Sequence, residues 1–180
     1  MAVVRNNGPG TVEFQPSGSS YVVSAPDGRE TARGVFTYAM PPRIAPGEVA
    51  YFVETLTALF ASADELSAVT VDIAARATDR ASTRLPIRDI VVTTSADGGV
   101  RVAGTVTNGG SAPLRSPYVG AVLFGIDGSP IAAVYDLTDL VGLAPGLEGK
   151  FETEYPGTGP VPPDDVGGTE VIAFDLADKG

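Results

Sequence analysis

This chain has 180 residues but no cysteine and no histidine, which excludes disulfides, Ser-His-Asp triads, Cys-His dyads and Cys/His zinc sites. Its formal net charge of −10 argues against a nucleic-acid binder, which needs a basic face to neutralise phosphates. No apolar run approaches the roughly 20 residues that a membrane-spanning helix needs. We therefore expect no nucleic-acid partner and no membrane span, in a cytoplasmic protein or in an exported one whose leader lies outside this sequence.

The first third of the chain consists of short apolar runs that end in turn residues. Residues 2–5 form such a run, and Asn6-Asn7-Gly8 ends it. Residues 21–25 lead into Asp27-Gly28, a tight-hairpin signal because both residues tolerate positive φ. Pro46-Gly47 then suits the two central positions of a type II turn. This alternation of runs and turns predicts antiparallel strands.

The middle of the chain contains a short helical signal and a linker. Ser62, with Glu65 three residues later, forms a capping-box pattern that predicts one helical turn over residues 63–66. A β-run over residues 69–77 closes the first half. The polar stretch that follows ends in Pro86, which forbids a continuous helix or central strand. We place the linker at residues 80–86.

The second half reads as a more complete β-unit. It opens with a predicted strand over residues 89–95 and closes with a β-run over residues 169–176. Asp127-Gly128 marks another tight hairpin between two apolar runs. Between these signals, apolar residues fall on alternate positions, the period of a strand with one buried face. These positions are Val100, Val102, Gly104 and Val106.

Turn residues and aromatics of the first half recur in the second half at an offset of 99 or 100 residues. The matches are Asp27-Gly28 with Asp127-Gly128, Val35-Phe36 with Val134-Tyr135, Ala45-Pro46-Gly47 with Ala144-Pro145-Gly146, and Phe52 with Phe151. We place a one-residue length difference between Asp27 and Val35. The pattern indicates two copies of one module, residues 1–79 and 87–180. The predicted fold class is all-β, two tandem Ig-like antiparallel β-sandwich domains of about seven strands each.

The two predicted copies differ at their first strand. The strand over residues 89–95 has no counterpart in the first copy, so residues 2–5 should form an open sheet edge. An unpaired edge is a template for association with another strand. Either the first strand precedes Met1 and lies outside this sequence, or another element fills the edge. For the second case, we hypothesise that a donated strand covers it, from the chain's own C-terminus or from a neighbouring copy, which would give a homo-oligomer.

In its order of strands and turns, the second copy resembles the bacterial FxLYD-type domains, which are immunoglobulin-like sandwiches of exported and cell-envelope proteins. Leu123-Phe124 stands for the Leu-Tyr of that family, and Asp127-Gly128 stands for its turn. Ala121 replaces the Phe of the family name, and Gly125 replaces the Asp. The resemblance implies a surface-exposed binding or spacer module without catalysis, and it transfers no functional residues to this chain.

Two acidic pairs occupy corresponding places in the two copies: Asp64-Glu65 and Asp164-Asp165. A paired carboxylate on a loop is a candidate Ca²⁺ site, because Ca²⁺ takes six to eight oxygen ligands. The alternative is that these residues cap the free N–H groups of a short turn. We favour capping, because no Asp-x-Asp-x-Asp run accompanies either pair.

Four arginines, Arg76, Arg80, Arg84 and Arg88, recur every four residues. On a helix they would form one basic ridge suited to an acidic partner. Pro86 and the strand runs on either side argue against a continuous helix, so solvated linker charge is the favoured interpretation.

Two further groups of residues are candidate sites. Four tyrosines could form a sugar-stacking face, but packing in the core or at strand edges is favoured because the chain has no tryptophan. They are Tyr38, Tyr118, Tyr135 and Tyr155. Neither Lys150 nor Lys179 lies in a Ser-x-x-Lys motif, so we expect no enzymatic activity.

The sequence thus predicts a non-catalytic binding, adhesion or spacer module that contacts another protein, in the extracellular space or cell envelope, with a cytoplasmic location as the other option. One alternative is a carbohydrate- or calcium-dependent accessory module of an extracellular enzyme. Another is an assembly subunit that exchanges strands with its neighbours.

Overall fold

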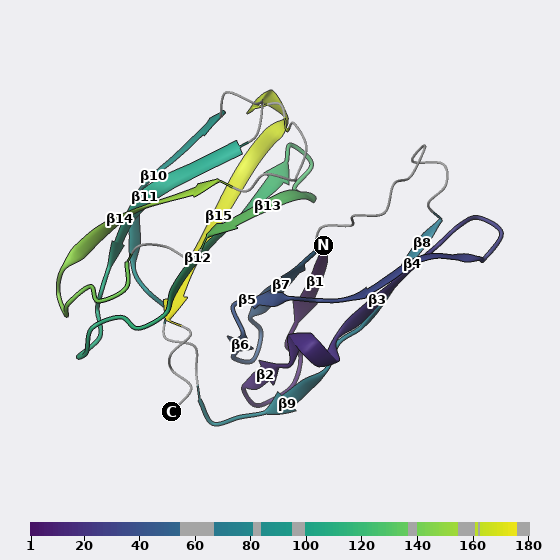
Figure 1. Ribbon diagram of the computed structural model, residues 1–180, viewed down its shortest axis with the longest axis horizontal. Coiled ribbons are helices and arrows are strands. Elements are labelled where there is room, and N and C mark those ends of the chain that lie inside the picture. Colours follow the sequence, from purple (N-terminus) through teal and green to yellow (C-terminus); the bar gives the residue numbers. More distant parts are fainter. Residues whose placement is uncertain are drawn as a thin grey trace. The chain divides into compact units, whose positions relative to one another are not determined.

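The structure is a computed structural model, and it describes residues 1–54, 67–80, 84–94, 100–136, 140–154, 161 and 163–175. The chain divides into two compact units, Met1–Ala81 and Ser82–Gly180. Figure 1 shows strands throughout both units. The described residues form fifteen strands in antiparallel sheets, two three-residue 3₁₀ helices and no α-helix, which confirms the all-β class. The predicted helical turn over residues 63–66 lies outside the described residues.

The strands of the two units are as follows. Strands β1 to β9 of the first unit span Ala2–Arg5, Val12–Phe14, Ser20–Ser24, Glu30–Val35, Tyr38–Met40, Arg43–Ile44, Val49–Val53, Ala68–Asp72 and Ala75–Ala77. Strands β10 to β15 of the second unit span Ile87–Thr94, Val100–Thr107, Pro117–Gly125, Pro130–Asp136, Glu148–Glu154 and Val166–Asp175. The described parts therefore contain nine and six strands rather than about seven each.

The first unit has one sheet of order β1-β7-β5 and a second, interrupted layer. In that layer, the 3₁₀ helix η1 (Pro16–Gly18) separates β2 from β3. The layer therefore consists of two sheets, β6-β2-β9 and β4-β3-β8, instead of one continuous sheet. Fully buried Ser19 bridges the break. Its Oγ donates to the Gln15 carbonyl and accepts the Ala74 N–H, both at 3.0 Å. The hydroxyl thus supplies bonds that a continuous ladder would have made.

Phenylalanines form the centre of the first unit's core. Phe52 on β7 packs edge-to-face against Phe14, with ring centroids 5.0 Å apart, and against Phe36 at 5.3 Å. Ala2 and Val4 of β1 are half-buried and pack against the same cluster. Aromatic rings of this size bury much apolar surface per residue, which suits a small unit without disulfides.

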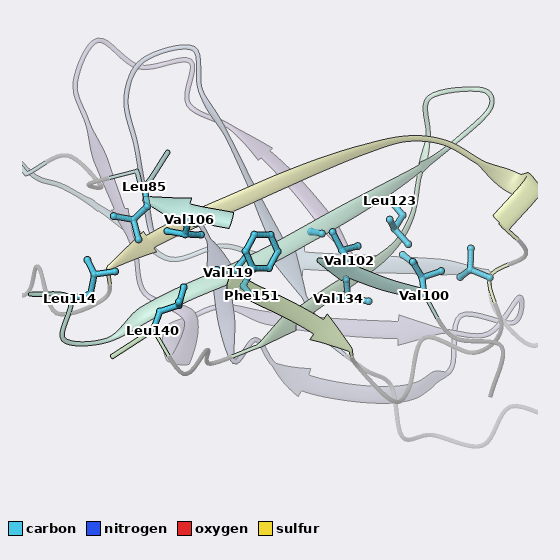
Figure 2. Packing of buried hydrophobic residues seen from close by; sticks show 14 residues of the cluster. Leu85, Val100, Val102, Val106, Leu114, Val119, Leu123, Val134, Leu140 and Phe151 are labelled. Carbon is cyan, nitrogen blue, oxygen red and sulfur yellow. The ribbon is translucent and has the colours of Figure 1, made fainter. Parts of the chain in front are cut away.

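The second unit packs two sheets, β10-β11-β14 and β13-β12-β15, around one core. The alternation predicted for residues 100–106 is present, because β11 alternates between buried and half-buried side chains along its whole length. Figure 2 shows Val102 and Phe151 gathered with Val119 and Val134 of the other sheet. This packing is β-sandwich-like. Gly104 leaves room for the Phe151 ring, because a Cβ at this position would lie 2.8 Å from the ring.

The predicted linker needs one correction. Leu85 is only 5% exposed, belongs to the core of the second unit, and donates its N–H to the Ala173 carbonyl at 2.9 Å. Pro86 accepts a hydrogen bond from the Thr107 N–H at 3.0 Å. An apolar side chain beside a proline is therefore packed as part of the second unit, so Leu85 does not belong to a linker.

The turns singled out from the sequence have equivalent hydrogen bonds in the two units. Gly28 and Gly128 have φ of 81° and 77°, and Gly47 and Gly146 have φ of 82° and 75°, the conformation that favours glycine. Glu48 N–H bonds to the Ala45 carbonyl, as Leu147 N–H does to Ala144, both at 3.1 Å. Pro-Gly thus occupies the centre of a type II turn in each unit, as predicted.

Two strand ladders also have matching registers. The first unit's ladder β1–β7 matches the second unit's ladder β11–β14. The residue numbers of matching positions differ by 102 between β1 and β11 (107 − 5) and by 99 between β7 and β14 (148 − 49). In the hairpins β3–β4 and β12–β13, both strands differ by 100. The equivalent pairs are Arg5↔Val49 with Thr107↔Glu148, Ala2↔Phe52 with Gly104↔Phe151, and Tyr21↔Gly34 with Ala121↔Val134.

The hairpin register corrects the match proposed between Val35 and Val134. Gly34, not Val35, stands opposite Tyr21 as Val134 stands opposite Ala121. A slip of one residue moves a side chain to the other face of the sheet, and Val35 is 56% exposed whereas Val134 is fully buried. By this match, the one-residue difference in length between the two units lies after Val35 and not between Asp27 and Val35. Large Tyr21 beside Gly34 replaces small Ala121 beside Val134, so the space is filled in both units.

Candidate functional site

The unpaired edge of β1 is the candidate binding site of the first unit, because an unpaired strand edge can pair with another strand. β1 pairs with β7 over Ala2–Arg5, and in the described part of the chain no strand pairs with its other side. Val3 on this strand is 51% exposed. The chain's own final strand, β15, pairs with β12 in the second unit, and residues 176–180 lie outside the described residues, so donation by the chain's own C-terminus stays a prediction. Donation by a neighbouring copy stays a prediction.

A buried asparagine fixes the turn that follows β1 and the turn that follows β11. Asn6 Nδ2 donates to the carbonyls of Gly10 and Ile44 at 2.7 and 3.2 Å, and its Oδ1 accepts the Gly8 N–H at 2.9 Å. Asn108 repeats this arrangement in the second unit. These side chains hold each turn to a distant strand or loop, so the strand before the turn has a fixed direction.

An ion-pair cluster crosses the sheet β6-β2-β9. Glu13 lies between Arg43 and Arg76 in the register of these strands, and its carboxylate accepts from Arg43 Nε at 3.1 Å and from Arg76 Nε at 2.8 Å. Arg43 is 6% exposed and Glu13 15%. The hydrogen bond from Arg76, followed by those from Arg43, lowers the pKa of the Glu13 carboxyl despite its burial.

The predicted arginine series does not form one ridge in the described residues. Arg76 lies on β9 and binds Glu13, whereas Arg88 lies on β10 and pairs with Glu148 and Asp89. Arg80 and Arg84 are exposed, and Arg84 forms an isolated bridge with Phe174. The series is split between the two units, so the four-residue spacing does not reflect a helix.

Only the second of the two acidic pairs proposed for calcium lies in the described part of the chain. Asp164 and Asp165 are exposed in the 3₁₀ helix η3 (Pro163–Asp165), whereas Asp64 and Glu65 lie outside the described residues. Within the described ranges, no group of three or more acidic side chains could hold a metal ion. Calcium binding therefore stays the untested alternative to capping, and a titration can test it.

We expect added calcium to leave the thermal unfolding midpoint unchanged, because two exposed carboxylates supply too few of the ligands that Ca²⁺ needs. The measurement is a thermal melt with and without Ca²⁺ at several times about 1 mM, the weak end of extracellular calcium modules. Magnesium at the same concentration is the control. A rise specific to Ca²⁺ that disappears in Asp164→Asn would contradict the capping interpretation.

The remaining predicted residues that the structure describes lie on different strands. Tyr118 is buried on β12 and stacks on Phe174 with ring centroids 5.0 Å apart, which is a packing role. Tyr38 is half-buried on β5. Tyr135 is on β13 without a described side chain, and Tyr155 and Lys179 lie outside the described residues. Lys150 is exposed on β14. These positions give no aromatic platform among the described residues.

Sequence reasoning missed one cleft in the second unit. It has a volume of ≈ 280 Å³ and is lined by the end of β10, the first residue of β11 and the start of β15: Val92, Thr93, Val100, Val166, Gly167, Gly168 and Thr169. Its signal in the sequence is the Gly167-Gly168 pair. Glycine is required at Gly167 because a Cβ would lie 2.7 Å from the Gly125 carbonyl oxygen.

No protein-family model, curated protein or solved structure matches this chain. The class that the structure itself defines is an all-β protein of small antiparallel sheets with β-sandwich-like packing. None of the helical segments in the described part of the chain has the length and apolarity that crossing a bilayer requires.

Proposed function

We propose that this chain is a non-catalytic binding, adhesion or spacer segment of an exported or cell-envelope protein, built from two tandem Ig-like β-sandwiches. The matching ladders and turn bonds of the two units carry this proposal. Two units that share the registers of two ladders, two glycine turns and a buried asparagine support duplication of one module. Repeated β-modules of this kind suit display of sheet edges and loops to another protein.

The described ionic groups also support a structural rather than a catalytic role. Glu13 binds Arg43 and Arg76 of the two strands beside it, and Glu148 on β14 binds Arg88 on β10, across β11. Their lowered pKa values therefore follow from ion pairs that join strands. A chain without histidine or cysteine lacks the most common general base and the most reactive nucleophile. The resemblance to FxLYD-type domains is the further reason to place the module outside the cytoplasm.

Surface labelling of intact source cells tests the proposed location. We expect an amine-reactive biotin reagent that does not cross the cytoplasmic membrane to label this protein, because Lys150 is exposed on β14. A Lys150→Arg, Lys179→Arg double variant should lose most of the label. A known cytosolic protein of the same cells serves as the control and should not be labelled. Labelling only after the cells are lysed would contradict an exported location.

A further inference from the structure

Two residues of β1 point their backbone N–H and C=O groups toward the side of the strand that is not paired with β7. Asn6 N–H donates to the Glu48 carbonyl, on the side of β7, at 3.0 Å. Because successive residues of a strand point their backbone groups to opposite sides, Val4 and Ala2 also face β7. Val3 and Arg5 therefore point their N–H and C=O groups away from β7, where the described residues provide no strand.

The second unit shows what occupies the equivalent edge. Asn108 N–H donates to Leu147 as Asn6 does to Glu48, so Thr107 is the counterpart of Arg5. Thr107 N–H donates to the Pro86 carbonyl at 3.0 Å, and β10 continues the ladder antiparallel to β11 from Ile87 onward. The same edge is thus covered in the second unit and has no partner strand among the described residues of the first.

Side chains of the covering strand complete the core of the second unit. Leu85 is 5% exposed within the core, and Ile87 packs against it, opposite Val106. The counterpart of Val106 is Val4, which is only half-buried although it packs on the phenylalanine cluster. A strand with two apolar residues at alternate positions would bury Val4 in the same way.

We propose that the β1 edge of the first unit accepts an extended strand of a partner protein, antiparallel to β1, with apolar side chains at two alternate positions, like Leu85 and Ile87 of the second unit. Main-chain hydrogen bonds from Val3 and Arg5 would supply affinity, and the two apolar side chains would supply selectivity. This inference rests on the proposed binding function and names the chemistry of its partner. β1 has only four residues, so another protein's strand, held by further contacts of its own, fits it better than pairing of two copies through β1 alone.

The probe is a fluorescent peptide with the sequence of residues 84–94, titrated into the full chain by anisotropy. We expect saturable binding that Val3→Pro weakens at least about tenfold, because proline removes an edge-directed N–H and obstructs the incoming strand. The bonds to β7 use Ala2 and Val4, so this variant keeps its ladder. A peptide carrying Leu85→Asp and Ile87→Asp should not bind.

Two controls separate this site from other edges. Val92→Pro obstructs the outer edge of β10, because Val91 and Thr93 are the residues that face β11, and it should bind the peptide like the unmodified chain. Amide exchange should slow at Val3 and Arg5 when peptide is added, and stay unchanged along β11. Equal binding by Val3→Pro, or protection at β11 instead, would overturn the proposal.

Self-association is the other outcome that counts against it. Protection of Val3 and Arg5 that rises with protein concentration in the absence of peptide would make a second copy the occupant. These outcomes differ from those of the labelling experiment, because an exported protein can fail to bind the peptide, and a cytoplasmic one can bind it.

Discussion

Replacing Asn108 by alanine should lower the free energy of unfolding of the second unit by about 2–4 kcal/mol. The side chain is fully buried, and its Nδ2 donates to the carbonyls of Ala112 and Leu143, both at 2.8 Å. Its Oδ1 accepts the Gly110 N–H at 2.9 Å. Truncation leaves these three backbone groups without the partner that the folded state provides, and each unsatisfied buried group is costly.

Hydrogen exchange at increasing urea measures this effect unit by unit, because a two-unit chain need not unfold in one transition. Asn108→Ala should speed exchange along β11 and leave β7 unchanged, whereas Asn6→Ala should do the reverse. Asn7→Ala is the matched control, since Asn7 is exposed beside Asn6. A loss below about 0.5 kcal/mol for Asn108→Ala, the level of ordinary surface changes, would show that the turn does not depend on this side chain.

Local signals predicted much of this fold. Alternation along residues 100–106 identifies β11 because a strand with one buried face has a period of two. Asp127-Gly128 and Pro46-Gly47 identify their turns because few residues other than glycine adopt φ near +80°. In each case the chemistry that decides the structure lies within a few residues, so the sequence alone contains it.

Contacts between distant segments were not predicted. Pro86 is a local breaker and so predicts a linker at Leu85, but Leu85 is buried in a core that includes Ala173, which is 88 residues away (173 − 85) and accepts its N–H. Val35 was matched to Val134 by residue type, yet only the pairing of β3 with β4 shows that Gly34 occupies that place. Composition cannot reveal a register, since a slip of one residue leaves every residue type the same.

The candidate site shows the same division. An open edge at residues 2–5 was predicted from the missing counterpart of one strand, which is a comparison within the sequence. The ion-pair cluster was not, because Arg43 and Arg76 are 30 and 63 residues from Glu13. Arg76 was read with Arg80 and Arg84 as a four-residue series, and only the order β6-β2-β9 assigns it to Glu13.

That assignment has a consequence for stability in acid. The arginines hold the pKa of Glu13 below its usual value of 4.5, so the folded state binds this proton less readily than the unfolded state. Its contribution to stability is therefore present above the usual value and is lost as the pH falls through the lowered one. We expect the free energy of unfolding to fall as the pH drops from about 5, and Glu13→Gln to show a shallower fall.

At neutral pH, Glu13→Gln should destabilise the first unit by about 2–3 kcal/mol, because Arg43 is almost fully buried and loses the carboxylate opposite it. Glu30→Gln is the matched control: Glu30 also has a lowered pKa, from the hydrogen bond of Arg33, but that pair is local and exposed. Urea unfolding of both variants at neutral and acidic pH separates the two cases, since a solvated pair contributes little. Equal behaviour of the two variants would mean that water, rather than the strands around it, solvates the Glu13 cluster.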